Sequence, residues 1–100
     1  NITWNDINQI LILKYGIWDF YKNHKDVWWW DAAKRRLSVI VQLSEENDYT
    51  GCELKFEKWN LTAPQDIWTV IVFPSCLTHQ VTTLTSWERY ALVSWFKRSY

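Results

Sequence analysis

Short apolar runs, rich in β-branched and aromatic residues and separated by polar clusters, follow one another along the whole chain. They recur at roughly the 8–12-residue spacing that is typical of an all-β sandwich or barrel, and helical periodicity is nearly absent. The sequence therefore predicts an all-β fold. The expected strands cover residues 8–15, 18–25, 36–44, 52–59, 66–73, 78–83 and 88–96.

Length and charge narrow the class of protein. At 100 residues the chain is expected to form a single domain over residues 1–100 with a modest core. Its 11 basic and 11 acidic residues leave no net field to attract nucleic acid or anionic lipid. No apolar run approaches the roughly 20 residues that a membrane-spanning helix needs. We therefore expect neither nucleic acid nor a membrane as a partner.

The cysteines and the first residue indicate the setting of the chain. Cys52 and Cys76 lack CxxC spacing, and no secretory leader is present, so reduced packing thiols in a cytoplasmic protein are expected. Asn1 stands where an initiating Met would be, and a strand-like pattern begins almost at once. We expect the chain to be a fragment of a longer protein.

Alternation along the strands separates two faces. In the run 36–44, the odd-numbered apolar residues oppose Ser38, Ile40, Gln42 and Ser44. In the run 88–96, Arg89 shares its side with the apolar residues at 91, 93 and 95. An arginine on an apolar face predicts a buried anion as its partner.

Three residues offer metal ligands. His24 and Asp26 are two apart, so on an extended strand they point the same way with Cα atoms about 6.6 Å apart. His79 becomes a third ligand if a closed β structure brings it beside them. Two histidines and one carboxylate form the facial triad of non-haem Fe(II) oxygenases. Zinc accepts the same ligands, but a zinc hydrolase needs a general base that these residues lack.

The order His24-Lys25-Asp26, then His79, then Arg89 ten residues later, resembles the iron- and 2-oxoglutarate-dependent dioxygenases. The likeness extends over nearly the whole chain to the prolyl-4-hydroxylase-like branch, specifically its bacterial and phage PKHD-type hydroxylases. The segments that carry it are YGIWDFYKNHKD (15–26), RLSVIVQLS (36–44), DYTGCEL (48–54) and FPSCLTHQVTTLTSWERYALVSWF (73–96).

This resemblance implies a double-stranded β-helix of the jelly-roll or cupin-like kind, without the helical N-terminal part that usually precedes it. It implies Fe(II) bound by the catalytic residues His24, Asp26 and His79. It also implies that Arg89 pairs with the distal carboxylate of 2-oxoglutarate, because a guanidinium binds a carboxylate through two parallel hydrogen bonds.

Three further residues are implied to bind the cosubstrate. Tyr15 and Tyr21 are expected near 2-oxoglutarate, where a phenol hydroxyl would add a hydrogen bond to the carboxylate. Gln42, on the inward side of its strand, is a more speculative partner of the same group. Tyr15 and Tyr21 also read as ordinary strand residues.

The resemblance implies an enzyme that consumes O₂ and 2-oxoglutarate, hydroxylates an unactivated C–H and releases succinate and CO₂, with ascorbate as an optional cofactor. A peptide or protein of prolyl type is the expected substrate, with a small molecule as the other option. An inactive β-barrel binding module of the same fold is the alternative. A small zinc or cupin-like metal protein is a third reading.

Tryptophan stands at unexpected places. Relatives of this branch usually carry glycine where this chain has Trp18, Cys52, Trp68 and Trp87, at turns or close backbone approaches. A bulky residue there costs about 1–3 kcal/mol if the glycine conformation persists. Either the turns are rebuilt, or the chain is a decayed or poorly folding version whose activity is in doubt.

The run Trp28 to Trp30 follows the HxD motif directly. Three adjacent side chains on an extended chain cannot all face one way. Two interpretations stay open: an aromatic lid over the substrate entrance, which would favour an apolar or peptide substrate, or a plug packed on the barrel edge or an oligomer surface.

Overall fold

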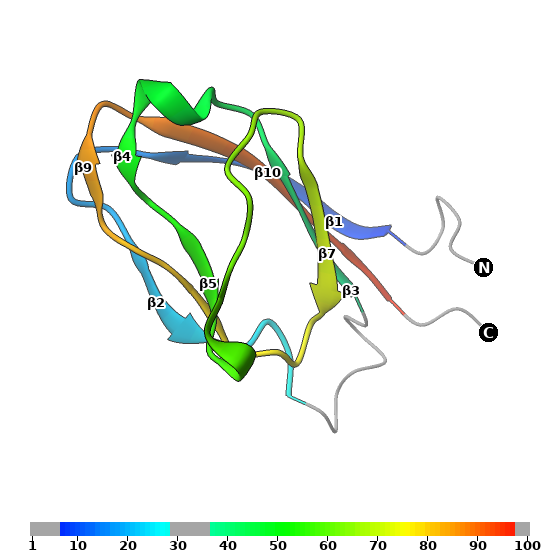
Figure 1. Ribbon diagram of the computed structural model, residues 1–100. Helices are drawn as coiled ribbons and strands as arrows, with labels where there is room; N and C mark the ends of the chain where they lie inside the picture. The colour runs from blue at the N-terminus through cyan, green and yellow to red at the C-terminus, as the bar shows by residue number, and fades with distance from the viewer. Residues whose placement is uncertain (1–6, 29–36, 98–100) are drawn as a thin grey trace.

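The computed structural model describes residues 7–28 and 37–97, which form β-strands joined by turns and two short 3₁₀ segments. Two four-stranded sheets lie across from each other, and a two-stranded pair closes one end (Figure 1). The predicted all-β fold is confirmed.

The first sheet has the strand order β1-β10-β3-β7, and every neighbouring pair is antiparallel. Its strands are β1 (Ile7–Tyr15), β10 (Arg89–Phe96), β3 (Leu37–Gln42) and β7 (Val70–Pro74). The inward residues include Ile40 and Val93, which are paired in register and buried. The outward face is apolar too, since one cross-strand row is Ile12, Leu92, Val41 and Val70.

The second sheet has the order β2-β8-β5-β6, and the small pair is β4-β9. These strands are β2 (Tyr21–His24), β8 (His79–Val81), β5 (Leu54–Phe56), β6 (Leu61–Thr62), β4 (Thr50–Gly51) and β9 (Leu84–Ser86). The 3₁₀ segments are η3 (Glu46–Asp48) and η4 (Lys58–Asn60). The chain therefore crosses repeatedly between the two sheets, as a double-stranded β-helix does.

The core lies between the sheets. Aromatic side chains fill much of it: Phe56 and Phe73 meet edge to face with ring centroids 4.9 Å apart. The other buried apolar residues are Tyr15, Ile40, Tyr49, Cys52, Leu54, Ala63, Val81, Leu84, Ala91, Val93 and Trp95. Polar residues share this interior, and they are concentrated at the site described below.

Several predicted strand boundaries were wrong because turns interrupt the apolar runs. The run 18–25 begins as strand only at Tyr21, because the amide of Asp19 donates to the carbonyl of Gly16 and closes a turn (2.9 Å). The run 52–59 is strand only over Leu54–Phe56, and the run 78–83 gives only the short β8. The short strands β4, β6 and β9 were not predicted.

Glycine is required at the end of strand β4. Gly51 has φ +74°, and a Cβ there would lie 2.1 Å from the carbonyl oxygen of Thr83. The next residue, Cys52, also has positive φ (54°) although it carries a side chain.

Among the described residues, the helices are far too short and polar to cross a lipid bilayer.

Candidate metal centre

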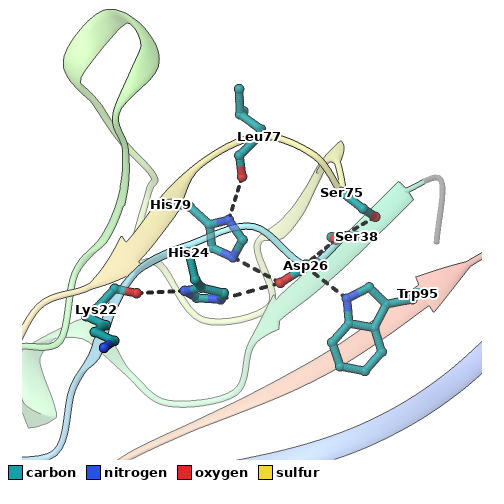
Figure 2. A network of polar contacts seen from close by, with 8 residues as sticks. All are labelled: Lys22, His24, Asp26, Ser38, Ser75, Leu77, His79 and Trp95. Carbon is teal, nitrogen blue, oxygen red and sulfur yellow. Dashed lines mark hydrogen bonds and ion pairs between the residues drawn. The ribbon is translucent and has the colours of Figure 1, made fainter. Parts of the chain in front are cut away.

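The ends of two paired strands bring the predicted ligands together. His24 ends β2 and His79 begins β8, and the two are direct partners in the antiparallel register. Asp26 lies just beyond β2, where its Oδ1 is 3.4 Å from Nε2 of each histidine. One potential ligand atom from each residue lies within 4.8 Å of the other two. Figure 2 shows both imidazoles directed at the carboxylate.

Backbone carbonyls orient both imidazoles. Nδ1 of His24 lies 2.7 Å from the carbonyl oxygen of Lys22, and Nδ1 of His79 lies 2.8 Å from that of Leu77 (Figure 2). A carbonyl oxygen only accepts hydrogen bonds, so in the neutral ring Nδ1 carries the proton and Nε2 keeps its lone pair. Both lone pairs therefore face the centre of the cluster, as metal ligation requires.

Two donors hold the other carboxylate oxygen of Asp26. Oδ2 accepts hydrogen bonds from Ser38 Oγ on β3 and from Trp95 Nε1 on β10, the latter at 3.0 Å. Ser38 Oγ is in turn 2.9 Å from Ser75 Oγ. Because Oδ2 is bound from the first sheet, Oδ1 is turned toward the histidines of the second sheet.

The protonation states suit a cation. Burial alone raises the pKa of Asp26, but the contact with His79 and the hydrogen bonds from Ser38 and Trp95 lower it to about 2. Burial lowers the pKa of His24 below its ordinary value. At neutral pH the cluster thus presents one carboxylate and an uncharged imidazole of His24, and this donor set fits a divalent transition metal with positions left open for other ligands.

A largely apolar pocket of roughly 230 Å³ adjoins the cluster. It is lined by Leu11, Leu13, Tyr15, Tyr21, His24, Lys25, Asp26, Ile40, His79, Val81, Val93 and Trp95. The pocket can therefore bring an apolar or amphipathic group next to the three candidate ligands and keep water away from it.

Arg89 is buried beyond this pocket, with 1% of its surface exposed. Its Nε and Nη2 donate to Oε1 of Gln42 at 3.2 and 2.8 Å, and its Nη1 lies 3.7 Å from Sγ of Cys52. The guanidinium thus donates to an amide oxygen in this structure, and the anion that the sequence predicts at Arg89 stays a prediction. Gln42 also donates from Nε2 to the carbonyl of Pro64 at 3.1 Å, which fixes its orientation.

The two tyrosines lie in different places. Tyr15 is buried and links the pocket to the arginine, because it lines the pocket and its ring centroid is 5.3 Å from Cζ of Arg89. Burial raises the pKa of Tyr15 to about 12, against the opposing effect of Arg89. Tyr21 is half-exposed and stacks on His24 with ring centroids 3.8 Å apart. It therefore packs against a candidate ligand.

Neither Ser38 nor Trp95 was predicted from the sequence as a residue of the site. Both lie on the inward face of a strand, Ser38 on the side of Gln42 and Trp95 on the side of Arg89. A polar residue on a buried strand face is the signal that could have found Ser38. The contact of Trp95 with Asp26 carries no such signal, because it joins residues 69 positions apart.

The tryptophan run is described only at Trp28, which is 55% exposed and lies beneath the ammonium of Lys25, 5.1 Å from the ring centroid. Trp29 and Trp30 lie outside the described residues, so the two interpretations of this run stay as they were.

The chain is similar to known proteins in sequence and in fold. A family model described as the 2OG-Fe(II) oxygenase superfamily matches residues 10–97. The chain belongs to this superfamily. Over 79 residues it is 30% identical to a PKHD-type hydroxylase of Prochlorococcus marinus (strain MIT 9215), a match that covers 77% of this chain and 36% of that protein. The predicted family resemblance is thereby confirmed.

Solved oxygenase structures superpose on this chain. A prolyl-4-hydroxylase of Pseudomonas putida matches with a TM-score of 0.74 and 25% identity, over 90% of this chain and 52% of that one. A 2OG-Fe(II) oxygenase family oxidoreductase of Burkholderia pseudomallei matches with a TM-score of 0.73 and 27% identity, over 93% and 45%. The chain thus spans about a third to a half of the length of these relatives.

Proposed function

We propose that this chain forms the catalytic core of an Fe(II)- and 2-oxoglutarate-dependent dioxygenase that hydroxylates an unactivated C–H and releases succinate and CO₂. The observation that carries the proposal is the convergence of His24, Asp26 and His79, from two strand ends, on one point beside an apolar pocket. Membership of the superfamily supports the same chemistry.

Each residue of the candidate metal centre has its own role in this proposal. Nε2 of both histidines and Oδ1 of Asp26 would hold the iron, which when bound supplies the activation of O₂. Ser38 and Trp95 keep Oδ2 occupied, so the carboxylate offers the metal one oxygen in a fixed orientation. The apolar pocket walls exclude water from the C–H that is to be oxidised.

The 2-oxoglutarate site that we propose uses Arg89 and Tyr15. The guanidinium is the buried cation of this region, and Tyr15 lies between it and the pocket. For a carboxylate to pair with Arg89, it must replace the amide oxygen of Gln42 or enter beside Cys52. A charged acceptor forms the stronger hydrogen bonds, so the exchange favours the dicarboxylate.

We further propose that the substrate is a peptide of prolyl type. Its support is the likeness to a PKHD-type hydroxylase and to a prolyl-4-hydroxylase, together with the apolar lining of the pocket. Assays of succinate release with proline-containing peptides, other peptides and free amino acids test chemistry and substrate together. Succinate release that persists in Asp26→Asn would remove Asp26 from the metal shell and count against the proposal.

A binding module without turnover is the second candidate, and one contact favours it. Sγ of Cys52 is 3.7 Å from Nη1 of Arg89, where an incoming carboxylate needs room. Anaerobic addition of Fe(II) and 2-oxoglutarate separates the two candidates. An oxygenase gives a visible metal-to-ligand charge-transfer band that His79→Ala loses. No band from a folded sample would favour the binding module.

A further inference from the structure

Four tryptophans have backbone conformations that belong to glycine. Their φ angles lie between 63° and 73°, in the left-handed region where a Cβ crowds the following peptide and which large side chains rarely adopt. The four are Trp18 (φ 73°), Trp59 (φ 63°), Trp68 (φ 69°) and Trp87 (φ 66°). The described residues contain only two other tryptophans, Trp28 and Trp95, so this conformation is the rule for tryptophan here.

Three of the four occupy the same place in a hydrogen-bonded β-turn. The turns are closed by amides donating to the carbonyl three residues earlier: Asp19 to Gly16 (2.9 Å), Asn60 to Glu57 (3.2 Å) and Thr69 to Asp66 (3.2 Å). Trp18, Trp59 and Trp68 are each the third residue of their turn. Type II turns require positive φ at that position, and glycine supplies it there without steric cost.

Burial does not offset this crowding, because all four indole rings are exposed, although Nζ of Lys58 lies 4.7 Å from the ring centroid of Trp59. The exposed fraction is 67% for Trp18, 75% for Trp59, 68% for Trp68 and 67% for Trp87. Trp95 is the opposite case: it lies within strand β10, is 8% exposed and donates to Asp26. Of the six tryptophans in the described residues, four thus stand at sites suited to glycine, whereas Trp95 is buried and hydrogen-bonded.

Composition points the same way. The chain has 9 tryptophans and 2 glycines, whereas glycine usually makes up about 7% of a globular protein. Tryptophan is thus in excess and glycine is scarce, and tryptophan stands where the backbone conformation suits glycine. Translation of a glycine codon as tryptophan would leave this pattern. UGA is such a codon, since some genetic codes read it as tryptophan and others as glycine.

We propose that positions 18, 59, 68 and 87 carry glycine in the protein as its own host makes it, and that UGA encodes all four. Trp95, by the same reasoning, is a true tryptophan encoded by UGG. Cys52 shares the positive φ but is buried against Arg89 and is not part of the proposal. The inference does not depend on whether the chain is an active oxygenase.

The residue at positions 18 and 68 affects the candidate site, because both turns are hydrogen-bonded to segments near it. The amide of Trp68 donates to the carbonyl of Gln42 at 2.7 Å, and Gln42 holds Arg89. Trp18 lies in the chain between the pocket residues Tyr15 and Tyr21, and its amide donates to the carbonyl of Leu84 at 2.9 Å. Glycine at 18 and 68 would let both turns form without crowding and so fix these side chains.

Paired substitutions test the conformational half of the proposal. At each of the four positions, glycine and alanine variants are compared by thermal unfolding, because both remove the indole and only glycine tolerates positive φ freely. Each glycine variant should melt on the order of 4–8 °C above its alanine counterpart. Phe20→Gly, at an exposed aromatic outside the set, should not stabilise. Glycine variants that melt no higher than the alanine variants would overturn the inference.

Peptide mass spectrometry of the protein from its own host tests the coding half and does not depend on how any variant folds. Peptides that span positions 18, 59, 68 and 87 should have the mass of glycine, and the peptide with position 95 that of tryptophan. Tryptophan at the four positions would refute the proposal and make the exposed indoles genuine surface groups.

Discussion

Trp95 donates a hydrogen bond from Nε1 to Oδ2 of Asp26 at 3.0 Å, and this contact joins strand β10 of the first sheet to the loop after β2. The other oxygen of the same carboxylate faces both histidines at 3.4 Å. The indole therefore sets which oxygen is available to a metal, although it lies outside the ligand set itself.

Trp95→Phe should weaken metal binding and leave the fold intact. Phenylalanine keeps most of the buried ring but loses the donor, so the carboxylate can turn away from the histidines. Loss of an outer hydrogen bond of this kind typically costs about 10–100-fold in metal affinity. Competition between the protein and a chelator for Co(II) measures the change. Trp28→Phe is the matched control, and a Trp95→Phe affinity equal to that of the control would rule out the positioning role.

Gln42→Leu should destabilise the protein and make its stability depend on 2-oxoglutarate. The substitution removes the oxygen that accepts from Nε and Nη2 of Arg89, and an unpaired buried charge of this kind costs about 3–5 kcal/mol. A dicarboxylate would replace the missing acceptor. Urea unfolding with and without 2-oxoglutarate measures both effects. An equal response of Gln42→Leu and the unsubstituted protein would place the cosubstrate away from Arg89.

Cys52→Gly should increase the affinity for 2-oxoglutarate several-fold. The thiol lies 3.7 Å from Nη1 of Arg89 on a residue with φ 54°, so glycine removes both the obstruction and the crowded backbone. Calorimetric titration of the metal-loaded protein with 2-oxoglutarate gives the change, with exposed Cys76→Ala as the control. Unchanged or weaker binding would mean that the carboxylate does not approach Arg89 from the side of Cys52.

Strand alternation predicted which side chains of a single strand share a face. It grouped Arg89 with Ala91, Val93 and Trp95, and this side of β10 is the buried one. Proximity of His24, Asp26 and His79 required a closed barrel and the family likeness, because no local pattern relates residue 24 to residue 79. The register of β2 with β8 is what joins them.

Turns and long-range polar partners were harder to predict. Apolar runs such as 52–59 read as one strand, yet the chain turns at Trp59 because the backbone takes a positive φ that its side chain disfavours. The hydrogen bond from Arg89 to Gln42 was not predicted, although both side chains face inward on neighbouring strands, because a neutral acceptor leaves no charge pattern in the sequence. Pairings of this kind become visible only with the register.

The two cysteines should differ sharply in reactivity. Burial raises the pKa of the Cys52 thiol, against the opposing effect of Arg89, and the side chain is almost fully enclosed. Cys76 is exposed. Iodoacetamide should therefore alkylate Cys76 in the native protein and reach Cys52 only after unfolding, as peptide mass spectrometry of the alkylated protein would report. Rapid labelling of native Cys52 would contradict its enclosure.

The same raised pKa gives the protein a dependence on alkaline pH. The folded state keeps the Cys52 thiol protonated to higher pH than the unfolded chain, whose thiol has a pKa near the ordinary value of 9.0. The unfolded state is then favoured increasingly as the pH rises above that value, so the free energy of unfolding should fall. Urea unfolding between pH 7 and about 9.5 measures this slope. Cys52→Ala should show a shallower one, and identical slopes would exclude Cys52 as its source.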